Sequence, residues 1–90
     1  MERPFDSLVR HRIAAYLSLP LEAVEPVQRL RRDLGLLPLD LVLIALSLED
    51  VASARLPIEH LDSVETVGQL ASFLRRCARI EGARSGRPDA

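Results

Sequence analysis

The sequence is poor in aromatic side chains and in cysteine. Its 90 residues include only three aromatics, Phe5, Tyr16 and Phe73, and no tryptophan. Platforms for single-stranded nucleic acid stack bases on aromatic side chains, so this count argues against one. The single cysteine, Cys77, excludes a disulfide within the chain. One cysteine and two histidines give no pattern of metal ligands, and we expect no metal site.

Lysine is absent as well. All 12 cationic side chains are arginines. The chain also has 13 acidic side chains, so the formal net charge is −1. The charge is unevenly spread, because residues 21–74 hold nine acids and four arginines, a net charge of −5. A protein that binds the phosphate backbone normally shows a basic excess on one face. We therefore expect no nucleic-acid partner.

Long hydrophobic runs are also missing. The longest, Leu41 to Leu46, has six residues, whereas a membrane span needs about 20. The first residues, with Glu2, Arg3 and Pro4, do not resemble a signal peptide. The sequence thus predicts a cytoplasmic protein without an integral membrane segment.

Leucine is abundant, with 17 residues, and apolar residues make up 48% of the chain. This suffices for one small aliphatic core. Helical spacing predicts three main helices over residues 6–19, 39 to 52 or 53, and 66–80, with a short helical turn at 59–63. Asp6 and Thr66 are expected N-caps, and Gln69 completes a capping box with Thr66. Pro38 is expected in the first turn of the second helix.

The connection between the first two helices, residues 20–38, is unusually long. Its three prolines and one glycine exclude a continuous helix. Apolar residues are spaced through it, which indicates a loop that wraps the bundle. We expect an all-α bundle of three main helices and one short helix over residues 1–80, with a disordered tail over residues 81–90.

Four short motifs occur at a characteristic joint spacing. They are Val24-Glu25-Pro26, Leu30-Arg31-Arg32-Asp33-Leu34-Gly35-Leu36-Leu37-Pro38-Leu39-Asp40, Leu56-Pro57-Ile58 and Val64-Glu65-Thr66-Val67-Gly68-Gln69-Leu70. With these motifs the chain, over about residues 8–76, resembles the acyl carrier protein family, which includes peptidyl carrier domains. The resemblance implies an acyl-carrier-protein-like bundle that serves fatty acid, polyketide or peptide biosynthesis. It implies a carrier and not an enzyme, and we find no pattern of catalytic residues.

The departure from the family lies where its chemistry is expected. The family pattern reads Asp-Leu-Gly-x-Asp-Ser-Leu-Asp, and its serine hydroxyl carries the 4′-phosphopantetheine arm. Here Pro38 takes the place of that serine, preceded by Leu37 and followed by Leu39. Since proline has no hydroxyl, we expect no arm at this position and no other cofactor. The sequence thus suggests a degenerate carrier that acts through protein contacts.

Two other functions stay open. The first is a working carrier modified at an atypical serine. Asp6-Ser7-Leu8 spells the same tripeptide, but an Asp/Ser pair is also typical of a helix start. Ser63 lies in a predicted turn and Ser47 lies within the second helix. The second alternative is a helical protein that holds a lipid or acyl chain non-covalently in its leucine-rich interior.

The second helix is expected to have two apolar faces. At 100° per residue one face holds the core positions Val42, Ala45, Leu48 and Ala52, with Leu41 and Ile44 at its margin. The opposite face holds Leu39, Leu43 and Leu46, with Asp50 in line. A surface helix of a lone globule has one apolar stripe, so the second face needs an explanation.

Two explanations are available for the second face. Either the long loop covers it through Leu30, Leu34 or Leu36, or it is a docking surface. In the family the second helix is the surface that partners recognise. The expected partners are a synthase, a transferase or another acyl-chain-handling enzyme, or a second copy of this chain. The predicted partner-binding residues are Leu39, Asp40, Leu43, Leu46, Glu49 and Asp50.

Overall fold

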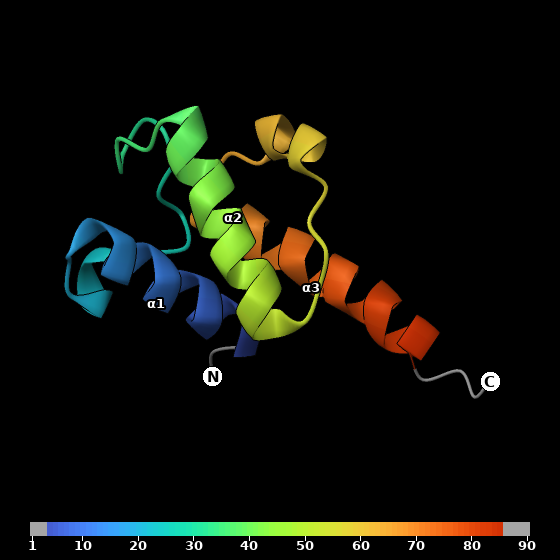
Figure 1. Cartoon of the computed structure of the whole chain (residues 1–90). Helices are drawn as coiled ribbons and strands as arrows, with labels where there is room; N and C mark the ends of the chain where they lie inside the picture. The colour runs from blue at the N-terminus through green and yellow to red at the C-terminus, as the bar shows by residue number, and fades with distance from the viewer. Residues whose placement is uncertain (1–3, 86–90) are drawn as a thin grey trace.

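The computed structural model describes the backbone of residues 4–85 and the side chains of residues 5–78. Over these residues the elements are α1 (Pro4–Leu17), η1 (Leu21–Ala23), α2 (Pro38–Ala52), η2 (Ile58–Ser63) and α3 (Val67–Ser85), where η denotes a 3-10 helix. α1 packs against both α2 and α3, and α2 crosses in front of the other two in Figure 1. The described part of the chain has no strand, so the predicted all-α bundle is confirmed.

The helix ends differ from the prediction at several points. α1 begins at Pro4, so Asp6 lies in its first turn and is not its N-cap. It ends two residues before Leu19, because Ser18 adopts a left-handed backbone with φ 58°. α3 extends to Ser85, five residues beyond the expected end, since adding residues to an existing helix costs little. Residues 86–90 of the predicted tail lie outside the described residues.

The start of α3 is stabilised as predicted. The Gln69 N–H donates to Thr66 Oγ1 at 3.1 Å, and the Thr66 N–H donates to Gln69 Oε1 at 3.2 Å. This reciprocal pair is the capping box. The predicted helical turn before it is also present, as η2, which starts one residue earlier than expected.

The long connection between α1 and α2 follows the surface of the bundle. The Leu30 N–H donates to the Glu65 carbonyl at 2.8 Å, and the Val67 N–H donates to the Gln28 carbonyl at 3.0 Å. Arg10 of α1 donates through Nε to the Val24 carbonyl at 2.7 Å. These bonds tie the loop to α1 and to the start of α3, so the prediction of a wrapping loop is confirmed.

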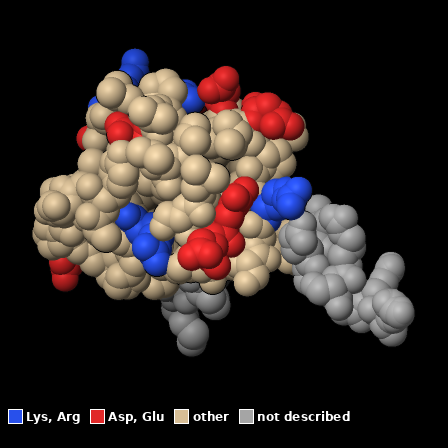
Figure 2. All heavy atoms as spheres, in the orientation of Figure 1, with Lys and Arg blue, Asp and Glu red and all other residues tan. Residues whose placement is uncertain are grey.

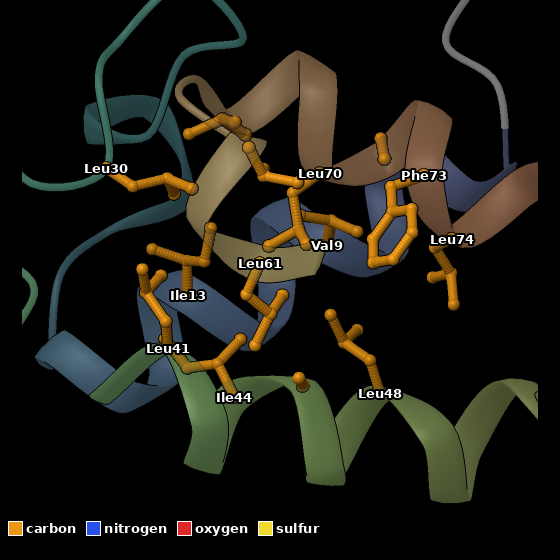
Figure 3. Packing of buried hydrophobic residues seen from close by; sticks show 14 of the residues in the cluster. Val9, Ile13, Leu30, Leu41, Ile44, Leu48, Leu61, Leu70, Phe73 and Leu74 are labelled. Carbon is orange, nitrogen blue, oxygen red and sulfur yellow. The ribbon is translucent and has the colours of Figure 1, made fainter. Parts of the chain in front are cut away.

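The core lies between the three helices and is almost entirely aliphatic. Figure 3 shows Val9 and Ile13 of α1 opposite Leu41, Ile44 and Leu48 of α2. The other side is closed by residues of α3, η2 and the loop, among them Leu70, Phe73, Leu74, Leu61 and Leu30. The core therefore fixes one face of α2 and leaves the opposite face outside. No helix among the described residues has the length and apolar character that a membrane crossing requires.

Candidate functional site

The candidate site begins at the first turn of α2. Pro38 opens the helix, as expected, and is exposed. Its fixed φ suits a first helical turn, where a backbone N–H has no intrahelical partner anyway. Leu37 and Leu39 on either side are 65% and 67% exposed. An apolar Leu-Pro-Leu segment therefore projects from the helix start.

Asp40 stabilises this helix start in place of an N-cap side chain. Its Oδ2 accepts the Leu37 N–H at 2.8 Å, which is half of a capping box, since the leucine side chain returns no bond. Its Oδ1 accepts the Tyr16 hydroxyl of α1 at 2.5 Å. The Tyr16 bond and then the Leu37 bond lower the pKa of Asp40, and the same Asp40 bond raises the pKa of Tyr16. Asp40 thus has a structural role within the chain.

The core face of α2 is centred slightly differently from the prediction. Leu41 and Ile44, expected at its margin, are fully buried with Ala45 and Leu48. Val42 and Ala52, expected in the core, are only half-buried. Val42 and Ala52 pack against the edge of the core, whereas Leu41 and Ile44 point into it.

The opposite face of α2 is exposed. Leu39, Leu43 and Leu46, which we call the leucine surface, are 67%, 45% and 47% exposed. Asp50 follows them on the same face and is also exposed. Figure 2 shows the front of the molecule over α2 as mostly uncharged, with acidic atoms gathered over the C-terminal end of the helix. The predicted second apolar face therefore exists.

The long loop does not cover the leucine surface. Leu30 and Leu36 are buried in the core, and Leu34 is half-buried against it. The explanation in which these residues shield the second helix is wrong. The loop uses its leucines to close the bundle core, because they lie between η1 and α2 on the core side.

Glu49, another predicted partner-binding residue, is engaged within the chain. Its Oε2 accepts the Leu56 N–H at 2.7 Å across the turn that follows α2. The acids of α2 thus divide by geometry. Asp40 and Glu49 hold the two ends of the helix, whereas Asp50 is exposed beside the leucine surface.

The sequence patterns did not reveal the contribution of Tyr16. Its ring is 42% exposed and its hydroxyl donates to Asp40. A shallow hollow between α1 and α2, lined by Tyr16, Arg12, Leu43 and Ser47 among others, adjoins the leucine surface. The sequence holds one local signal for a structural role of Asp40, which we predicted as a partner-binding residue: an acid in the first turn of a helix can accept a backbone N–H that precedes the helix.

The attachment of a 4′-phosphopantetheine arm requires a hydroxyl. Pro38 has none, so a phosphodiester cannot form at this residue. Ser7 and Ser47 are half-buried within α1 and α2, and Ser63 is exposed at the end of η2, where its hydroxyl donates to the His60 carbonyl at 3.1 Å. None of these serines begins a helix after a Leu-Gly loop.

Comparison with known proteins identifies the family. No protein-family model matches the chain. The chain is 32% identical over 77 residues to "Acyl carrier protein 3" of Ralstonia nicotianae, covering 86% of this chain and 88% of that protein. It is 35% identical over 80 residues to "Acyl carrier protein" of Saccharopolyspora erythraea, covering 87% of this chain and 84% of that protein. The resemblance inferred from the sequence motifs is confirmed: the chain belongs to the acyl carrier protein family.

Proposed function

We propose that this protein is an acyl carrier family member that carries no arm at position 38 and acts through protein contacts. Its partner would be a synthase, a transferase or another acyl-chain-handling enzyme of fatty acid, polyketide or peptide biosynthesis. In this role the chain is a cytoplasmic binding protein and not an enzyme. The leucine surface, with Asp50 at its edge, is the proposed contact.

One observation carries the proposal: the exposed first turn of α2, where the family attaches its arm, holds proline. Serine in this place has an exposed hydroxyl that attacks coenzyme A and accepts the arm. Proline cannot do so, yet it suits the helix start at least as well. The exchange removes the carrier chemistry and keeps the helix that partners recognise.

The surroundings of Pro38 are suited to apolar contacts. Leu37 and the leucine surface together expose on the order of a few hundred Å² of apolar area. At about 25 cal/mol per Å² the burial of this area contributes several kcal/mol to binding, before subtraction of the translational and rotational entropy lost on association. Asp40 and Glu49, the acids that flank this area, are held by bonds within the chain. Docking through leucines would therefore depend weakly on salt concentration.

The attachment chemistry is tested by incubation with coenzyme A and a broad-specificity phosphopantetheinyl transferase, followed by intact mass measurement. We expect no mass gain for the natural chain. The matched control is the double variant Leu37→Asp/Pro38→Ser, which restores the family pattern and should gain the mass of one arm. A mass gain of one arm on the natural chain would contradict the proposal and favour a carrier modified at another serine.

The docking surface is tested in the native cells by photo-crosslinking. A photoreactive amino acid in place of Leu43 should capture an acyl-chain-handling enzyme. The same amino acid in place of Val27, which is 77% exposed on the long loop, is the matched control and should not capture it. Equal capture from both positions, or capture from neither, would rule out docking through the leucine surface.

A further inference from the structure

Four exposed residues of α2 have the spacing by which two helices pack along a common seam. Leu39, Leu43, Leu46 and Asp50 are separated by 4, 3 and 4 residues. This is the alternation of the inward-facing positions of a heptad repeat. The seam residues are exposed, whereas Leu41, Ile44 and Leu48 of the same helix point into the core (Figure 3). α2 therefore has one side packed in the bundle and a second side shaped for another helix.

The single charge on this seam selects the direction of the second helix. In a parallel pair of α2 helices each seam residue meets its own counterpart, so Asp50 would face Asp50 of the second copy. Like charges directly opposed are unfavourable. In an antiparallel pair centred midway between positions 43 and 46, Leu43 of one copy meets Leu46 of the other. Positions 39 and 50 have the same midpoint, so Leu39 of one copy meets Asp50 of the other. Asp50 then lies beside the first turn of the other α2, where the helix dipole favours an anion.

We infer that two copies of this chain associate reversibly through their leucine surfaces. The two α2 helices lie antiparallel about a two-fold axis between Leu43 and Leu46. Such an interface is self-complementary, as a two-fold axis requires. The first turn of α2 has an acid of its own, Asp40, but this residue lies toward α1, where its carboxylate accepts the Tyr16 hydroxyl. α2 is already held in its helix by the bundle core, so association requires no folding.

The size of the surface determines the strength of the dimer. α2 has 15 residues, a length of about 22 Å at 1.5 Å per residue. The leucine surface is smaller than the roughly 800 Å² per partner of a stable complex. The dimer therefore forms as the protein concentration rises and dissociates on dilution. The dimer covers the surface proposed above for enzyme docking, so self-association and docking compete.

Sedimentation velocity of the full chain over a range of concentrations tests the dimer. We expect a species of twice the monomer mass that grows with concentration. The variant Leu43→Ser/Leu46→Ser should remain a monomer with unchanged helix content by circular dichroism. Its matched control is Val27→Ser/Ile58→Ser, two exposed apolar residues outside α2, which should still dimerise. A monomer at all concentrations, or equal loss of dimer in both variants, would overturn the inference, and enzyme docking would still stand or fail by its own tests.

Disulfide trapping in a Cys77→Ser background tests the direction of the helices. In the antiparallel pair the two copies of position 39 lie 11 residues apart along the seam, about 16 Å, and a disulfide needs Cα atoms within about 7 Å. Leu39→Cys alone should therefore give no disulfide-linked dimer. An equimolar mixture of Leu39→Cys and Asp50→Cys should give a mixed dimer. A disulfide-linked dimer of Leu39→Cys alone would show a parallel pair and overturn the proposed arrangement.

Discussion

Glu49 offers a direct test of whether a surface acid of α2 serves the fold or a partner. Its Oε2 accepts the Leu56 N–H at 2.7 Å in a half-buried position. Glu49→Ala leaves that N–H without its acceptor, and the loss of a hydrogen bond to a charged group lowers the free energy of unfolding by about 1.5–3 kcal/mol. Because Glu49 is half-buried and water has some access, we expect a value near 1.5 kcal/mol.

Urea unfolding followed by circular dichroism measures this effect. The variant Glu49→Gln keeps a carbonyl acceptor and should recover most of the loss. Asp50→Ala, one residue along at an exposed position, should change the free energy of unfolding by less than about 0.5 kcal/mol. All variants are compared in the Leu43→Ser/Leu46→Ser background, so that self-association does not add to stability. If Glu49→Ala is as harmless as Asp50→Ala, the hydrogen bond to Leu56 does not stabilise the fold.

Two further predictions concern the helix start and the core. The pKa of Asp40 is lowered in the folded state, so its contribution to stability is present above the unfolded pKa of about 3.9 and is lost as pH falls through the folded value. In Tyr16→Phe the free energy of unfolding should fall less as the pH is lowered, which urea unfolding at several pH values measures. The same pH dependence in the variant and the natural chain would contradict the role of the Tyr16 bond. Leu48→Ala should lower the free energy of unfolding by about 2–5 kcal/mol, because Leu48 is fully buried. Leu39→Ala should change it by less than about 0.5 kcal/mol, and similar losses for both would refute the assigned faces of α2.

The sequence predicted the three main helices and the second apolar face of α2 for physical reasons that act locally. Thr66 and Gln69 define a capping box within four residues, and Pro38 fixes φ at a helix start. The spacing of Leu39, Leu43 and Leu46 places them on one face of any α-helix. These features depend on neighbours in sequence, so no tertiary contact was needed to infer them.

The features that the sequence did not reveal depend on contacts between distant segments. Tyr16 and Asp40 are 24 residues apart, and their bond requires α1 to lie against the start of α2. Local sequence patterns within the first helix give no sign of this contact. Likewise, the leucines of the long loop were equally compatible with shielding α2 or closing the core. Only the path of the loop beside α3, set by bonds such as Leu30 N–H to the Glu65 carbonyl, decides between them.

If Pro38 occupies the attachment position of the family, as we propose, the Leu37-Pro38 pair would remove the chemistry of the family and leave its fold intact. Leu37 leaves α2 without an N-cap side chain, a change that costs about 1 kcal/mol relative to aspartate. Pro38 offsets part of this, since a proline that fits the native φ stabilises by about 0.4–1 kcal/mol through the unfolded chain. The two effects nearly cancel, so the free energy of unfolding of Leu37→Asp/Pro38→Ser, measured in urea, should lie within about 1 kcal/mol of that of the natural chain. A much larger difference would mean that position 38 is coupled to the core, so that the proposed exchange of serine for proline would change the stability of α2 as well as the chemistry.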